Sequence, residues 1–257
     1  MNDFTARTAL ITGAGRGIGQ AVALELAAAG ASLLLVARSA SQLARTRDLA
    51  DASGARPGQV RLIPADLGDE QQRTAAAAAA AGAGVDILIN NAATVEPLGA
   101  TAAIPAAELR RAFEVNVVAP AALEAAVLPG MLEAGWGRIV NVSSGIVARP
   151  DGMIRANAYA TTKAALEAHT VSLAAELAGT GVTVNAYRPG GVDTAMQAWI
   201  RDQDPDRIGP ALHERFTRSF AEGTLITPAQ SATALIAYLG TGDTGAIWDV
   251  RTAPARS

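Results

Sequence analysis

Several residue types that carry common protein chemistry are missing or scarce in this chain of 257 residues. It has no cysteine and two histidines, His169 and His213, which excludes disulfides, cysteine nucleophiles and the usual zinc sites. We expect no metal site. No strongly apolar run reaches the roughly 20 residues of a membrane span, and no basic segment precedes an apolar one at the N-terminus. These absences favour a cytoplasmic protein with no membrane partner.

Charge and length also argue against several classes of protein. The net charge is -3, the isoelectric point is near 5.5 and the twenty arginines are scattered, which argues against a nucleic-acid partner. A chain of 26.1 kDa has ample length to bury a core, and no linker divides it. We therefore expect one domain spanning residues 1–257.

Short β-rich runs alternate with helical patterns, which is typical of a parallel sheet with helices on both faces. The predicted strands lie near residues 8, 32, 60, 85, 137 and 182, with a seventh in AIWDV near the end. Helices are predicted to begin near Gly17, Ser41, Asp69, Pro105 and Asn157, the third with a run of alanines as its body. The expected fold class is α/β, a doubly wound parallel sheet of about seven strands.

One segment breaks this alternation. Residues 195–227 contain DQDPDRIGP, with bulky residues such as Trp199, Ile200 and Phe216 around it. Because an insertion of that length in a compact domain is often a lid, we expect this segment to cover a substrate site.

A glycine-rich turn follows the first predicted strand and opens directly into a helix. In TGAGRGIG, the glycines at 13, 17 and 19 have the spacing G-x-x-x-G-x-G, which is neither the usual G-x-G-x-x-G nor a P-loop. Backbone amides and a positive helix end favour a pyrophosphate there, and glycine lets the backbone approach it closely. We predict dinucleotide binding by Gly13, Arg16, Gly17, Ile18 and Gly19.

The end of the second strand indicates which dinucleotide is preferred. An acidic residue there binds the ribose 2′-hydroxyl of NAD(H), whereas an arginine accommodates the 2′-phosphate of NADP(H). The strand ends LLLVARS, with Arg38 at its end, Arg16 in the glycine turn and no acid from Ser32 until Asp48. We therefore predict NADP(H) in preference to NAD(H).

The scarcest residue type marks the candidate catalytic site. Lys163 is the only lysine and stands four residues after Tyr159, a placement that chance gives about 3 times in 257. Residues four apart share one face of a helix, so the ammonium can approach the phenol. Because free tyrosine has a pKa of about 10, a positive neighbour favours the phenolate. The alternative, a solvated surface lysine, requires this spacing to be accidental.

Four motifs in this order resemble the classical short-chain dehydrogenase/reductase family, and the likeness covers essentially the whole chain. They are TGAGRGIG at 12–19, NNAA at 90–93, Asn116 in FEVNVV, and Ser144 with Tyr159 and Lys163. The resemblance implies a Rossmann-type fold and hydride transfer between NADP(H) and a carbonyl or alcohol substrate. It also implies a homodimer or homotetramer.

The resemblance implies a role for each matching residue. Tyr159 is the expected general acid/base, Ser144 the hydroxyl that polarises the carbonyl, Lys163 the group that binds the nicotinamide ribose and lowers the pKa of Tyr159, and Asn116 the holder of a water relay. The other expected cofactor contacts are Asp66 at adenine, Asn90 and Ala92 at the adenosine ribose, and Pro189, Val192 and Thr194 at the nicotinamide amide.

The chain departs from the family pattern at three places. Ser144 lies about two residues further from Tyr159 than is usual, which leaves Ser143 as an alternative. NNAA replaces the commoner NNAG. The C-terminal DVRTAPARS lacks the usual glycine-rich ending, which concerns oligomer contacts more than chemistry.

The expected substrate pocket is mostly apolar. Its predicted lining is Ile146, Met153, Ile154, Met196, Trp199 and Ile200, and Arg149 or Arg155 is open as a partner for a substrate carboxylate or phosphate.

Other functions are less well supported by the sequence. The main alternative is a non-catalytic NADP(H)-binding redox sensor, which has no need of the set Asn116, Ser144, Tyr159 and Lys163. The run NVSSG is not the G-x-S-x-G of serine hydrolases, and there is no room for the substrate domain of the extended dehydratases and epimerases.

Overall fold

The computed structural model describes residues 4–53 and 58–254, where the chain forms a parallel sheet in the strand order β3-β2-β1-β4-β5-β6-β7. All the pairings between these strands are parallel. The strands are β1 Thr8–Thr12, β2 Ser32–Ala37, β3 Val60–Pro64, β4 Ile87–Asn90, β5 Gly137–Val142, β6 Val182–Arg188 and β7 Ile247–Asp249. The predicted doubly wound sheet is confirmed, and each strand lies at its expected place.

The strands are near-continuous aliphatic runs because helices cover both faces of the sheet. Residues 33–36 of β2 and all four residues of β4 are buried. Side chains alternate along each strand, so Ile11 and Leu33 belong to one core while Leu10 and Leu34 belong to the other.

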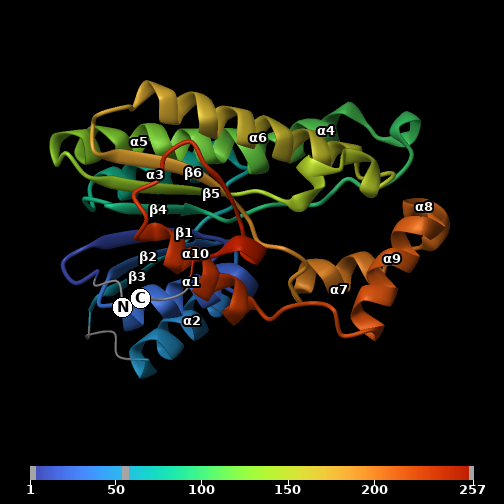
Figure 1. Ribbon diagram of the computed structural model, residues 1–257, viewed down its shortest axis with the longest axis horizontal. Coiled ribbons are helices and arrows are strands. Elements are labelled where there is room, and N and C mark those ends of the chain that lie inside the picture. The colour runs from blue at the N-terminus through green and yellow to red at the C-terminus, as the bar shows by residue number, and fades with distance from the viewer. Residues whose placement is uncertain (1–3, 54–57, 255–257) are drawn as a thin grey trace.

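Two layers of helices enclose the sheet (Figure 1). One layer consists of α1 Gly17–Ala28, α2 Ala40–Ala52 and α10 Pro228–Leu239. The other contains α3 Glu70–Ala81, α4 Ala106–Phe113, the π-helical turn η2 Glu114–Val118, α5 Ala119–Glu133 and α6 Asn157–Glu176. The alanine run forms α3 as predicted, with Asp69 as N-cap accepting from the backbone N–H of Gln72 at 2.9 Å and Gly82 following its last turn.

Among the described residues, one continuous helix, Ala106–Glu133, is long and apolar enough to cross a membrane by length and composition. It comprises α4, η2 and α5, and it lies in the helix layer beside α3 and α6. Its buried polar residues, Asn116 and Glu124, hydrogen-bond to neighbouring elements. These contacts are those of a core helix.

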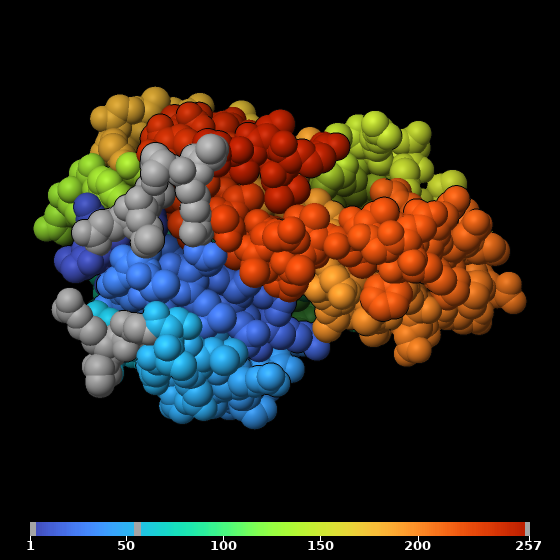
Figure 2. Space-filling view, turned by 60° about the horizontal axis from the view of Figure 1, so that its bottom comes forward, coloured from blue at the N-terminus to red at the C-terminus, as the bar shows by residue number. Residues whose placement is uncertain are grey.

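Residues 195–227 fold into helices rather than a loop. They are α7 Ala195–Arg201, α8 Pro205–Ile208 and α9 Pro210–Ala221. Together they form a lobe that stands out from the body of the molecule (Figure 2, orange). A third, smaller core packs Ile200, Ile208 and Phe216 of this lobe against Tyr159 and Met153. The lobe is therefore attached at the candidate catalytic residues.

Candidate active site

The carboxyl ends of the strands open onto a cavity of about 1600 Å³. Its walls come from the glycine turn after β1, the end of β2, the segments after β4, β5 and β6, helices α6, α7 and α9, and the turn after β7. The strand order reverses at β1, which has β2 on one side and β4 on the other. Doubly wound sheets bind ligands at such a reversal.

The glycine turn has the geometry that close approach to a phosphate requires. Gly13 and Gly17 have φ of +65° and +59°, a region that favours glycine. A Cβ on Gly19 would lie 2.4 Å from the carbonyl oxygen of Gly13, so α1 can begin against the turn only with glycine there. Gly13, Arg16, Gly17 and Ile18 line the cavity, whereas Gly19 packs behind it. The residues therefore fit a pyrophosphate at the start of α1.

Thr12 and Asn91 join the glycine turn to the end of β4. The hydroxyl of Thr12 accepts from the backbone N–H groups of Asn91 and Ala92, each at 2.9 Å. Asn91 and Ala92 line the cavity. Asn90 does not, because its side chain is buried and donates to Oδ1 of Asn141 at 2.9 Å. Successive residues at a strand end face opposite sides, so Asn91, which sequence reasoning missed, lines the cavity while the Asn90 side chain points away from it.

Two arginines whose side chains form no ion pair among the described residues stand beside the glycine turn. Arg16 follows Gly15, and Arg38 follows Ala37 at the end of β2. A Cβ on Gly15 would lie 3.6 Å from the Cβ of Ala37, so the turn packs on the strand end and the two arginines flank it. Both are exposed and line the cavity. In the described part of the chain, neither side chain has a hydrogen bond or ion pair.

Asp66 lies in the cavity wall beyond the end of β3. Its carboxylate accepts from the backbone N–H of Gly68 at 3.0 Å and from Arg111 at 2.6 Å. Partial burial alone would raise the pKa of Asp66, but these hydrogen bonds and the charges of Arg111 and Arg38 hold it below its ordinary value. Asp66 is therefore an ionised acceptor at neutral pH.

Helix α6 brings Tyr159 and Lys163 together in the cavity wall, both buried. The ammonium lies 5.9 Å from the centroid of the Tyr159 ring and donates to the carbonyl of Val142 at 2.6 Å. Burial lowers the pKa of Lys163 to about 8, and the charge of Glu167 partly opposes that shift. The prediction that Tyr159 and Lys163 lie on one face of a helix is therefore confirmed.

Burial also raises the pKa of Tyr159, and a hydrogen bond with Ser144 opposes the shift. The expectation that Lys163 lowers this pKa is not met, because burial sets the direction and the ammonium donates to the Val142 carbonyl instead. At neutral pH the phenol is therefore protonated and able to donate.

The two serines after β5 have different partners. Ser143 is buried, and its hydroxyl donates to Oε1 of Glu167 at 2.7 Å. Ser144 caps the short helix η3 Gly145–Ala148, where its Oγ accepts from the backbone N–H of Ile146 at 3.3 Å. Ser144 is therefore the hydroxyl next to Tyr159, whereas the alternative, Ser143, also lines the cavity but donates its hydroxyl proton to Glu167.

Asn116 lies in the π-helical turn and is fully buried. Its amide donates to the carbonyl of Thr94 at 2.8 Å and to the hydroxyl of Thr162 at 3.0 Å, while its Oδ1 accepts from the N–H of Thr94 at 2.8 Å. Both amide protons are thus used to fix the segment after β4 against α6. Its expected role in a water relay stays a prediction.

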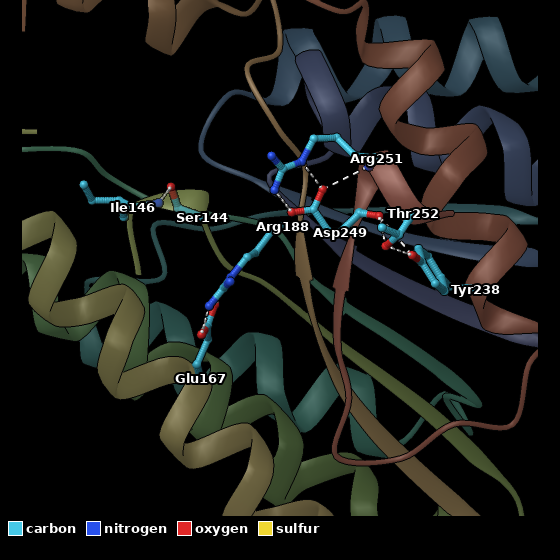
Figure 3. A network of polar contacts seen from close by, with 8 residues as sticks. All are labelled: Ser144, Ile146, Glu167, Arg188, Tyr238, Asp249, Arg251 and Thr252. Atoms are coloured by element: carbon cyan, nitrogen blue, oxygen red, sulfur yellow. Dashed lines mark hydrogen bonds and ion pairs between the residues drawn. The ribbon is translucent and has the colours of Figure 1, made fainter. Parts of the chain in front are cut away.

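The segment after β6 completes the wall beside Tyr159. Pro189, Val192 and Thr194 line the cavity as expected. Just before them, Arg188 donates through Nε and Nη2 to Glu167 at 2.8 and 2.7 Å (Figure 3). Sequence reasoning missed this buried pair, although Glu167 stands four residues after Lys163 and so shares its helix face.

The predicted substrate lining is met in part. Ile146, Arg149, Met153, Met196 and Ile200 line the cavity, and Trp199 packs against the small core beside it.

Two predicted lining residues lie elsewhere. Ile154 is 66% exposed and lies outside the cavity. Arg155 donates to the carbonyls of Asp206 and Arg207 at 2.7 and 3.1 Å, so it holds α8 rather than facing substrate. Phe216, Arg207 and Arg215 of the lobe line the cavity instead, which only the folding of residues 195–227 into helices brings about.

Comparisons with known proteins agree with this geometry. A family model described as short chain dehydrogenase matches residues 7–205. The chain is 36% identical to the ketoacyl reductase HetN of Nostoc sp., over 81% of this chain and 72% of the relative. It is 34% identical to 2-(R)-hydroxypropyl-CoM dehydrogenase of Xanthobacter autotrophicus, over 91% of each. Its structure matches L-sorbose reductase of Gluconobacter frateurii, solved with NADPH and L-sorbose, with a TM-score of 0.83 and 25% identity over 97% of each chain.

Proposed function

Because the chain belongs to the short chain dehydrogenase family, we propose that Tyr159 is the general acid/base of its reaction and that NADP(H) is its preferred cofactor. The protein is an NAD(P)-dependent oxidoreductase that transfers a hydride between the nicotinamide and a carbonyl or alcohol group. The observation that carries the assignment of Tyr159 is its place in the cavity wall, buried beside Ser144 and Lys163.

The bound dinucleotide supplies or accepts the hydride. In the reductive direction, Tyr159 donates its proton to the carbonyl oxygen as negative charge grows there, which is general acid catalysis worth typically 10² to 10⁴ in rate. The raised pKa of Tyr159 keeps the phenol protonated for this step. Ser144 stabilises the same oxygen with a hydrogen bond. Lys163 binds the nicotinamide ribose and, once that ribose is in place, favours the phenolate left after proton transfer.

The preference for NADP(H) rests on Arg16 and Arg38. They flank the end of β2 without an acid between them, and a 2′-phosphate there would meet two guanidinium groups. Asp66, tied to Arg111, then lies on the adenine side, with the backbone of Ala92 near the adenosine ribose. Pro189, Val192 and Thr194, which line the cavity after β6, are proposed to contact the nicotinamide amide.

The lobe formed by α7–α9 acts as a lid over the substrate. Met196, Ile200 and Phe216 face the cavity from it, opposite Ile146 and Met153. The apolar part of a carbonyl compound fits these side chains, and Arg149, Arg207 and Arg215 line the same cavity. The sensor alternative has no observation in its favour.

A second copy of the chain is the proposed partner, in a cytoplasmic homodimer or homotetramer. Val118 of η2, Leu132 of α5 and Val171 of α6 are 39 to 44% exposed, and such apolar surface favours association. Analytical ultracentrifugation of the protein and of a Val171→Glu variant tests this assembly, since the charge should lower the association state.

The function is tested by measuring NADPH consumption against a panel of aldehydes, ketones, quinones and 3-oxoacyl thioesters, with Tyr159→Phe protein in parallel. We expect turnover that the variant lacks, because the variant retains the ring but cannot donate a proton. Equal turnover in both proteins would remove Tyr159 as the acid. NADPH binding without turnover of any compound would favour the sensor.

A further inference from the structure

Helix α6 presents three functional groups in a row. Tyr159, Lys163 and Glu167 are four residues apart, so phenol, ammonium and carboxylate stand on one face, each a turn from the next. All three side chains are buried. The proposed chemistry uses the first two and leaves Glu167 without a role.

The carboxylate of Glu167 receives hydrogen bonds from two other segments of the site. Its Oε1 accepts from the hydroxyl of Ser143 at 2.7 Å and from Nε of Arg188 at 2.8 Å, and its Oε2 accepts from Nη2 of Arg188 at 2.7 Å. Glu167 is 5% exposed. A buried carboxylate with three charge-assisted or hydroxyl donors is fixed in one orientation.

These contacts extend to the groups that would meet substrate and cofactor. Ser143 immediately precedes Ser144, and Arg188 immediately precedes Pro189. Lys163 donates to the carbonyl of Val142, the residue before Ser143. One turn of α6 therefore holds the end of β5 at two successive residues and the end of β6 through an ion pair.

We propose that Glu167 is a positioning residue that holds Ser144 and the Pro189 segment against α6 and balances the positive charges of Lys163 and Arg188. The effect of Glu167 on catalysis rests on the proposed function, but its effect on the charges of Lys163 and Arg188 does not.

The charged groups around Lys163 define what happens when Glu167 is neutralised. On its own helix it faces Tyr159 and Glu167, and Arg188 stands behind Glu167 at the end of β6. Asp249 of β7 attracts Arg188 but is itself paired with Arg251 at 2.7 Å (Figure 3). Without the Glu167 charge, Lys163 loses the attraction that partly opposes its burial, and Arg188 loses its ion-pair partner, so the ammonium is disfavoured.

The single lysine makes this charge directly observable. Protein grown with lysine carrying ¹³C at the ε carbon gives one side-chain resonance, that of Lys163, whose titration needs no assignment and no substrate. In the parent protein the midpoint should lie at a pKa of about 8. In Glu167→Gln it should fall by about one pH unit, the lower end of the effect of a close opposite charge.

Companion variants separate charge from general loss of structure. Glu167→Asp keeps the charge and should restore the parental midpoint in large part. Glu124→Gln is the matched control, because Glu124 is an equally buried carboxylate on neighbouring α5 whose partners include Asn141 and His169. Its variant should lose stability yet keep the parental midpoint. If Glu167→Gln does not fold, Arg188→Met tests the same charges in the opposite direction, and the midpoint should rise.

Kinetics then connects the charge to the reaction. A one-unit shift predicts that kcat for NADPH-dependent reduction falls about fivefold at pH 8 in Glu167→Gln and hardly changes at pH 6. An unchanged lysine titration in both Glu167→Gln and Arg188→Met, or an equal shift in Glu124→Gln, overturns the inference. If the lysine midpoint shifts in Glu167→Gln but the parent protein reduces no carbonyl compound, this inference is sustained and the proposed function is refuted.

Discussion

Replacing Arg38 with alanine should weaken binding of NADPH and leave binding of NADH almost unchanged. Arg38 stands at the end of β2, lines the cavity and forms no hydrogen bond or ion pair among the described residues, although its charge attracts the carboxylate of Asp66. Its guanidinium is therefore free to bind the 2′-phosphate, the one group that distinguishes the two cofactors. Arg16 stands on the other side of the same position, where the turn packs on the strand end.

The size of the effect follows from the exposure of the two arginines. A charge-assisted hydrogen bond contributes roughly 1.5 to 3 kcal/mol, and exposure to solvent places this one at the lower end. About 1.4 kcal/mol corresponds to a factor of ten, so Arg38→Ala should raise the Kd for NADPH about tenfold. The double variant of Arg16 and Arg38 should raise it toward a hundredfold if the two contributions add.

Isothermal titration with NADPH and NADH, at a fixed ionic strength near 0.15 M, measures both affinities under comparable screening. Arg45→Ala is the control, since Arg45 is an exposed arginine of α2 that does not line the cavity. The reasoning is refuted if Arg38→Ala binds NADPH as tightly as the parent, or if it loses affinity for both cofactors equally.

Three further predictions concern stability and the lid. Gly19→Ala should lower the free energy of unfolding by about 1 to 3 kcal/mol and abolish measurable cofactor binding, because its Cβ would lie 2.4 Å from a backbone oxygen. Gly130→Ala should instead raise the free energy of unfolding by up to about 1 kcal/mol, because its Cβ would meet open space in α5. Thermal unfolding of the two variants separates these outcomes. A hydrogen bond with Glu124 raises the pKa of His169 despite partial burial. The stabilisation of the fold by the His169–Glu124 contact is therefore complete below the unfolded pKa of about 6.5 and is lost as pH rises through the folded pKa. His169→Gln should then lower Tm more at pH 5.5 than at pH 8. The reverse order would contradict this contact as the cause. Arg155→Ala should raise KM for substrate about fivefold with little change in kcat or NADPH affinity, since it frees α8 without touching the chemistry; unchanged KM would remove Arg155 from lid placement.

Much of the fold and part of the site could be predicted from local pattern alone. Short aliphatic runs that alternate with helical segments are typical of buried strands in a parallel sheet, and the seven strands lie where the sequence suggests. The pair Tyr159 and Lys163 is equally local, because a spacing of four in a helix fixes their relation.

Contacts between distant segments could not be predicted in the same way. Asn90 and Asn91 differ only in which side of the strand end they face, and that depends on the packing of Asn141 from β5. Glu167 meets Arg188 only because β6 runs beside β5. The sequence indicates that residues 195–227 cover the site, but not that Arg155 hydrogen-bonds to the carbonyls of α8, because that contact depends on how the segment folds into helices.

The two ends of the lobe formed by α7–α9 lie side by side. Val192 and Ile226 form an isolated bridge, with the N–H of Asp193 donating to Ile226 and that of Ile226 donating to Gly191, both at 2.9 Å. Most of its buried side chains belong to the small third core and not to the two cores under the sheet. Residues between the two bridge positions can therefore change with little effect on the two cores that hold the sheet together.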